Sequence, residues 1–102
     1  MAAATLLALS ALAVLVPLSD PAPIPAPVAG EARWRLPTGS DIRYVHLPAR
    51  GPARPAPVVF LHGGPGIADL AGEAAFVGRL AADGFDVDVY DQLGAGGSTR
   101  LR

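Results

Sequence analysis

The chain has 102 residues, of which 51% are hydrophobic, and its eight basic residues, all arginine, oppose nine acidic ones for a formal charge of −1. A chain of this length holds one small domain at most. After residue 30, eight arginines face eight acidic residues, so no positive excess points to a nucleic acid partner. The lack of cysteine excludes disulfides, thiolate catalysis and cysteine zinc sites, and two histidines without a neighbouring carboxylate cluster argue against a metal site.

Residues 2–19 carry no charge and are rich in leucine, valine and alanine. As a helix they would extend about 27 Å, slightly less than a hydrocarbon core of roughly 30 Å. A membrane span explains the missing basic residues, whereas a signal peptide fits the length but lacks a basic start and a clear Ala-x-Ala site. A buried helix of a soluble domain is the third interpretation. The first two predict contact with a membrane through residues 2–19, in an anchored or exported protein rather than a cytoplasmic one.

A linker rich in proline and alanine is predicted at residues 20–30. Five prolines fall between residues 17 and 27, mostly alternating with alanine. Such a run cannot form a helix and favours an extended, semi-rigid spacer. The sequence therefore divides into a hydrophobic segment at 1–19, this spacer, and a folded part at 31–102. We expect the folded part to be the incomplete N-terminal portion of a larger domain.

The folded part begins with a predicted β-hairpin at residues 31–47, whose turn is Pro37-Thr38-Gly39-Ser40. Ile42 and Tyr44 alternate with Arg43 and Val45 in its second strand. Trp34 and Tyr44 on the facing strands are expected to pack together. The uncharged run at residues 58–61 predicts a strand that is buried on both faces.

A helix and another strand are predicted next. Asp69 is placed to cap a helix with apolar residues at helical spacing, and Gly84 stands where a helix-ending glycine belongs. Residues 85–90 then predict a strand. Strand, helix and strand form a βαβ unit, which implies a parallel sheet and an α/β fold class. Two parallel strands and a hairpin cannot bury their own faces, so we expect further strands and helices after residue 102.

A glycine-rich turn follows the strand predicted at residues 58–61. Residues 62–66 read His-Gly-Gly-Pro-Gly. Ligands of parallel sheets bind at the carboxyl ends of strands, where this turn lies. Its glycines leave backbone N–H groups uncovered and let a substrate approach closely. Amides held in this way can form an oxyanion hole, which stabilises charge developing on a carbonyl oxygen.

This turn resembles the His-Gly-Gly-Pro-Gly signature of proline iminopeptidases and related α/β-hydrolases of the same peptidase family. Residues 91–98, Asp-Gln-Leu-Gly-Ala-Gly-Gly-Ser, resemble the family's Asp-Gln-Arg-Gly-x-Gly-x-Ser segment, with Leu93 and Gly97 at positions where that family often carries arginine. The resemblance covers about residues 31–102. It implies the N-terminal part of an α/β-hydrolase fold, a β-hairpin followed by a βαβ unit, here preceded by a hydrophobic helix.

The activity that the resemblance implies is that of a serine hydrolase with a Ser-Asp-His triad. It implies no metal and no cofactor, and a peptide or small acyl substrate that loses an N-terminal residue, often proline. Gly64 would donate an oxyanion N–H, and His62 would orient the loop without being the triad histidine. The expected site residues, including those that shape the two loops, are His62, Gly63, Gly64, Pro65, Gly66, Asp91 and Gln92.

No Gly-x-Ser-x-Gly nucleophile motif occurs in the chain. Ser98 follows a loop rather than a strand, so we interpret it as a turn or capping residue and not as the nucleophile of a triad with His62 and Asp91. We therefore expect the parent protein to be the enzyme, with its nucleophile, acid and base beyond residue 102. This chain alone is expected to be inactive.

Two functions of other classes are also considered. A dinucleotide-binding βαβ unit would use Gly64 and Gly66 at the helix start and Asp91 against a ribose hydroxyl. The third glycine of that motif is replaced by Asp69, whose carboxylate would repel a pyrophosphate. A small membrane-anchored protein with a non-catalytic role is suggested by residues 2–19. A phosphate-binding P-loop is excluded because the chain has no lysine.

Overall fold

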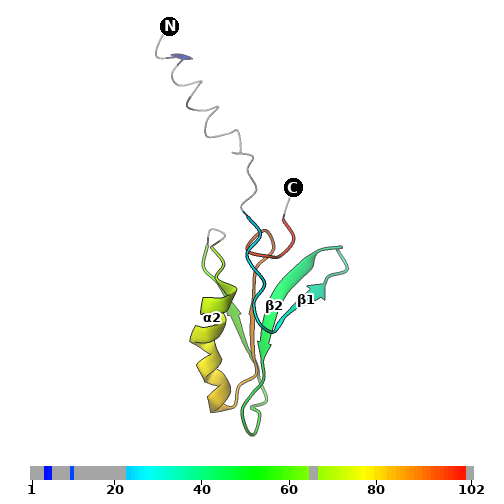
Figure 1. The fold of residues 1–102 in the computed structure, drawn as a ribbon, viewed down its shortest axis with the longest axis vertical. Helices are drawn as coiled ribbons and strands as arrows, with labels where there is room; N and C mark the ends of the chain where they lie inside the picture. The colour runs from blue at the N-terminus through cyan, green and yellow to red at the C-terminus, as the bar shows by residue number, and fades with distance from the viewer. Residues whose placement is uncertain (1–3, 6–9, 11–22, 65–66, 101–102) are drawn as a thin grey trace.

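A four-stranded mixed sheet with one helix packed on it forms the folded part of the chain (Figure 1). The computed structural model describes residues 4, 5, 10, 23–64 and 67–100. The strands lie in the order β1-β2-β4-β3, and helix α2 continues directly into the 3₁₀ helix η1. The elements are β1 (Glu31–Arg35), β2 (Asp41–Leu47), β3 (Val58–Leu61), α2 (Leu70–Val77), η1 (Gly78–Asp83) and β4 (Val87–Tyr90).

The predicted hairpin is confirmed. β1 and β2 pair antiparallel, and the turn between them is closed by the Leu36 N–H, which donates to the Ser40 carbonyl at 2.8 Å. Gly39 in this turn has a φ of 84°, a left-handed conformation that favours glycine. Trp34 and Tyr44 stack with ring centroids 3.9 Å apart and planes at 21°, so the predicted cross-strand pair is also confirmed.

The helical segment begins and ends at the predicted capping residues, but only α2 is α-helical, and its continuation at Gly78–Asp83 is the 3₁₀ helix η1. The Asp69 carboxylate accepts a hydrogen bond from the Gly72 N–H at 3.1 Å and caps α2. Gly84 ends η1 with a φ of 88°. A Cβ at Gly78 would lie 3.0 Å from Leu47 Cδ1, so this glycine lets the helix approach β2 closely.

The core lies between α2 and one face of the sheet. Its buried centre consists of one residue from β2, two from α2 and two from β4, against which partly buried apolar side chains pack. The central residues are Val45, Leu70, Val77, Val87 and Val89. Burial alternates along β4, where the two valines are fully buried and the residues between and after them are half-buried, so α2 covers one face of the sheet.

The prediction that residues 58–61 are buried on both faces is wrong. Val59 is 50% exposed and Leu61 57% exposed, whereas Val58 and Phe60 pack against the core. The physical reason is that the core, with α2, lies on the face of β3 that carries Val58 and Phe60. Among the described residues, no second helix covers the opposite face.

The predicted fold class, an α/β unit forming the N-terminal part of an α/β-hydrolase fold behind a hydrophobic helix, is also wrong. β3 and β4 pair in parallel, as the strand-helix-strand pattern predicted, but β2 pairs antiparallel with the other side of β4. Residues 23–64 and 67–100 thus form a small mixed sheet of four strands with a single α-helix, and the sheet dominates. Local patterns missed the β2–β4 pairing because strand order depends on long-range packing.

No helix within the described ranges is long and apolar enough to cross a membrane. The hydrophobic segment predicted at 1–19 lies almost entirely outside those ranges. The described end of the predicted spacer lies against the sheet, where the Ala26 carbonyl accepts a hydrogen bond from Arg43 and Val28 packs on the core. The spacer therefore contacts the folded part before β1 begins.

Candidate functional site

Two loops meet at one edge of the sheet, after β3 and after β4. Because these strands are parallel and Leu61 stands opposite Tyr90, the residues that follow them emerge on the same side. The loops enclose an open groove of about 360 Å³. Its lining combines the start of the glycine-rich turn with the start of the second loop: His62, Gly63, Gly64, Gln92, Leu93, Gly94 and Ala95.

His62 and Gln92 fasten the two loops to each other. The Gln92 backbone N–H donates to His62 Nε2 at 3.1 Å, and the Gln92 side-chain amide donates to the His62 carbonyl at 2.7 Å. His62 is only 6% exposed. The structure therefore brings together two expected site residues that lie 30 positions apart.

The same contacts fix the state of the imidazole. Because a backbone N–H can only donate, His62 Nε2 is the acceptor, and the ring proton resides on Nδ1. Nδ1 then donates to the Gly63 carbonyl at 2.8 Å. Both ring nitrogens are thus engaged, so His62 is not free to act as a general base in this arrangement.

The bond to the Gly63 carbonyl also orients the next amide. In a planar trans peptide, the carbonyl and the following N–H point in opposite directions. Since the Gly63 oxygen points at the His62 ring, the Gly64 N–H points away from it. Among the described residues, neither the Gly63 nor the Gly64 N–H has a hydrogen-bond partner. A Cβ at either position would meet no atom within 4 Å, and both glycines line the groove.

Pro65 and Gly66, which were also expected to shape this turn, lie outside the described residues. The structure begins again at Ile67, before the cap of α2. The candidate oxyanion donor is therefore the Gly64 N–H, whose orientation is fixed by the bond between His62 and the Gly63 carbonyl.

Asp91, the last expected site residue, is fully buried at the end of β4. Its Oδ2 accepts hydrogen bonds from Arg43 Nε and from the Gly97 N–H, both at 2.7 Å. Oδ1 has no partner within the described ranges. Asp91 is thus an anchor of the second loop and does not line the groove.

Arg43 is the residue that sequence reasoning missed. It lies on β2 with its side chain 3% exposed, whereas the alternation of β2 gave no reason to bury it. A Cβ at Gly97 would lie 2.6 Å from Arg43 Nε, so the guanidinium occupies the space next to this glycine. The signal that could have found it is the second loop itself, where glycines stand at two consecutive positions and leave room for a long side chain from elsewhere.

Ser98 has a structural role, in agreement with its interpretation as a turn residue. It is 4% exposed, its Oγ donates to the Asp91 carbonyl at 2.6 Å, and it accepts from the Arg43 N–H at 2.8 Å. Neither contact involves an imidazole, and both nitrogens of His62 are occupied elsewhere. A triad of Ser98, His62 and Asp91 is therefore not formed.

The carboxylates also oppose a dinucleotide site. Asp91 is paired with Arg43 and is 0% exposed, so it cannot reach a ribose hydroxyl. Asp69 is at the N-terminus of α2, where a pyrophosphate would have to bind. Across the described residues, no group of three metal-ligating side chains is present.

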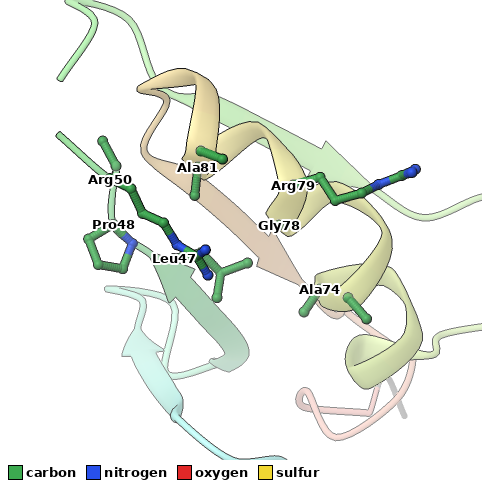
Figure 2. A pocket seen from close by; sticks show the side chains of 10 residues that line it. Leu47, Pro48, Arg50, Ala74, Gly78, Arg79 and Ala81 are labelled. Carbon is green, nitrogen blue, oxygen red and sulfur yellow. The ribbon is translucent and has the colours of Figure 1, made fainter. Parts of the chain in front are cut away.

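A larger groove lies away from this site. It has about 650 Å³ and runs between α2, η1 and the segment after β2 (Figure 2). Its floor consists mainly of alanine and glycine, and its charged residues are Arg50 and Arg79. Figure 2 shows that Arg50 lies along Leu47 while Arg79 extends away from it, so the two guanidinium groups do not converge on a ligand. The groove holds no nucleophile and no acid.

Comparisons with protein-family models, curated proteins and solved structures gave no match to this chain. The functional argument therefore rests on the two loops and their contacts.

Proposed function

We propose that this chain carries the oxyanion-hole loop of a serine hydrolase similar to proline iminopeptidases. The hydrolase would release an N-terminal residue from a peptide or a small acyl substrate. The observation that carries the proposal is the bond from His62 Nδ1 to the Gly63 carbonyl, which turns the N–H of the groove-lining residue Gly64 away from the imidazole. An oxyanion is stabilised by an N–H donor whose orientation is already fixed before the reaction begins.

The chemistry follows from the direction of that amide. When a serine attacks a carbonyl, negative charge develops on the carbonyl oxygen, and a fixed N–H lowers the barrier without having to reorient. His62 supplies the fixation, and the Gln92 side chain holds the His62 peptide from the other loop. No metal or cofactor takes part in the proposed reaction.

The nucleophile, acid and base are assigned to polypeptide outside these 102 residues, which contain no Gly-x-Ser-x-Gly motif. The uncharged residues 2–19 support a membrane-associated or exported location. The oxyanion-loop assignment predicts that the 102-residue chain by itself hydrolyses a prolyl arylamide no faster than buffer. Activity that disappears in Ser98→Ala would overturn it.

The decisive experiment reads the coding sequence on both sides of this chain and assays the product of the uninterrupted frame. The proposal requires a nucleophile motif followed by an acid and a histidine, and hydrolysis of a prolyl arylamide. Replacing His62 by leucine should then lower kcat about 10²–10³-fold with little change in KM, since the loss of one oxyanion donor has this effect. A frame without such residues would refute the hydrolase and favour an anchored, non-catalytic protein.

A further inference from the structure

We propose that Arg43 is a positioning residue for the oxyanion loop and acts through Asp91, Gln92 and His62. The last step of this inference rests on the proposed function, whereas the link from Arg43 to His62 does not. Arg43 is on β2, outside both loops that border the groove.

The first step is the hold of Arg43 on the second loop. Its Nε donates to Asp91 Oδ2, its backbone N–H donates to Ser98 Oγ, and its carbonyl accepts from the Asp91 N–H at 2.9 Å. Ser98 Oγ in turn donates to the Asp91 carbonyl. These bonds form a closed set that ties both ends of the segment 91–98 to one residue of β2.

The second step is the fixed position of the guanidinium. Arg43 Nη1 donates to the Ala26 carbonyl at 3.1 Å and lies 3.5 Å from Glu31 Oε2. Three acceptors in different directions suit a planar, branched cation, and a lysine ammonium cannot reach them together. The guanidinium is therefore fixed by its contacts with Ala26 and with Glu31 of β1, in addition to its bond to Asp91.

The third step is the contact between the second loop and the glycine-rich loop after β3. Gln92 directly follows the anchored Asp91, and its N–H and side-chain amide are the two groups that bind His62. Displacement of Asp91 moves the Gln92 N–H, which donates to His62 Nε2. The imidazole then loses its fixed orientation, and its bond to the Gly63 carbonyl is no longer held in place. Arg43 thus determines the direction of the Gly64 N–H without touching the groove.

The test uses the uniformly ¹⁵N-labelled 102-residue chain and compares Arg43→Met and Arg43→Lys with Arg35→Met. Arg35 is the matched control, since its ion pair with Asp41 is at the surface. Two signals are read: the ring ¹⁵N shifts of His62, which report whether Nε2 is an acceptor, and hydrogen exchange of the Gln92 amide. We expect both Arg43 variants to lose the Nδ1–H signature and to accelerate exchange at Gln92 about tenfold or more relative to amides of β4. Arg35→Met should change neither signal.

Gly97→Ala keeps the test decisive if Arg43→Met fails to fold. The new Cβ would lie 2.6 Å from Arg43 Nε, so it displaces the guanidinium while all charges remain. The inference is overturned if a folded Arg43 or Gly97 variant leaves both signals unchanged. It is also overturned if the Gln92 and β4 amides accelerate equally, because that pattern reports a general loss of stability, or if lysine restores the wild-type signals. Failure of the hydrolase assay alone would leave these readouts intact and would refute only the proposed function.

Discussion

Replacing Asp91 by alanine is expected to unfold most of the chain. Asp91 is 0% exposed, and its partner Arg43 is 3% exposed, so the variant leaves a positive charge in the interior without its main partner. The Gly97 N–H also loses its acceptor. Surrounding water cannot compensate the loss at Arg43, because its side chain is buried, and it compensates only part of the loss at the half-buried Gly97 amide.

The magnitude follows from these contacts. Breaking a buried ion pair by removing one partner costs about 3–5 kcal/mol. Glu31 Oε2, 3.5 Å from Arg43 Nη1, offsets part of this cost, while the orphaned Gly97 N–H adds about 1–3 kcal/mol. The net loss is therefore about 3–5 kcal/mol, which equals the whole stability that a core of roughly 70 residues supplies.

Urea titration followed by Trp34 fluorescence measures this effect, since Trp34 stacks on Tyr44 in the folded hairpin. Titrations in the presence of a stabilising osmolyte return a largely unfolded variant to a measurable range. Asp41→Ala is the control, because its pair with Arg35 is exposed and should cost about 0–1 kcal/mol. If Asp91→Ala loses no more stability than Asp41→Ala, the reasoning about the buried pair is refuted.

Three further substitutions test the fold and the groove by the same titration. Leu70→Ala, at a core position that is 1% exposed, should lower the free energy of unfolding by about 2–5 kcal/mol. A loss below about 1 kcal/mol would contradict the assigned core. Gly84→Ala should cost at least about 1 kcal/mol, because φ is +88° and a Cβ would lie 2.8 Å from the Pro52 carbonyl; an unchanged midpoint would disprove this turn. Gly64→Ala should change stability by less than about 0.5 kcal/mol, since its Cβ meets nothing within 4 Å, and a larger loss would show that the Cβ position is not open.

Elements with local signals could be predicted from the sequence. The cap at Asp69, the left-handed Gly84 and the turn at Gly39 each depend on residues within a few positions, and all three are present in the structure. The parallel pairing of β3 with β4 is also local in origin, because it follows from the single helix between them. Such features require no knowledge of the rest of the chain.

The position of β2 and the burial of β3 could not be predicted in this way. β2 pairs with β4 across more than 40 residues, Tyr44 opposite Tyr90, and no local pattern encodes that choice. β3 is uncharged like a central strand, yet it stands at the end of the strand order. The composition of a strand is compatible with several positions in a sheet, and the neighbouring elements determine which of its side chains are buried.

The candidate site could be predicted only in part, because some of its contacts are local in the sequence and others are long-range. The glycine-rich turn and the residues after β4 are recognisable as short strings, and the structure brings His62 and Gln92 together. Arg43 was not found because an arginine within an alternating strand has the appearance of a solvent-facing residue. Its burial depends on Asp91, 48 positions later, and on the missing side chain of Gly97.

The two outer strands of the sheet differ in their protection against other chains. β1 reads Glu-Ala-Arg-Trp-Arg and carries a charge at every second position, whereas β3 reads Val-Val-Phe-Leu and has no partner on its outer side among the described residues. An uncharged open edge recruits strands from neighbouring molecules, and a net charge of −1 provides little colloidal repulsion against it. Of the two outer strands in the described sheet, β3 is therefore the one at which pairing with a second molecule is expected.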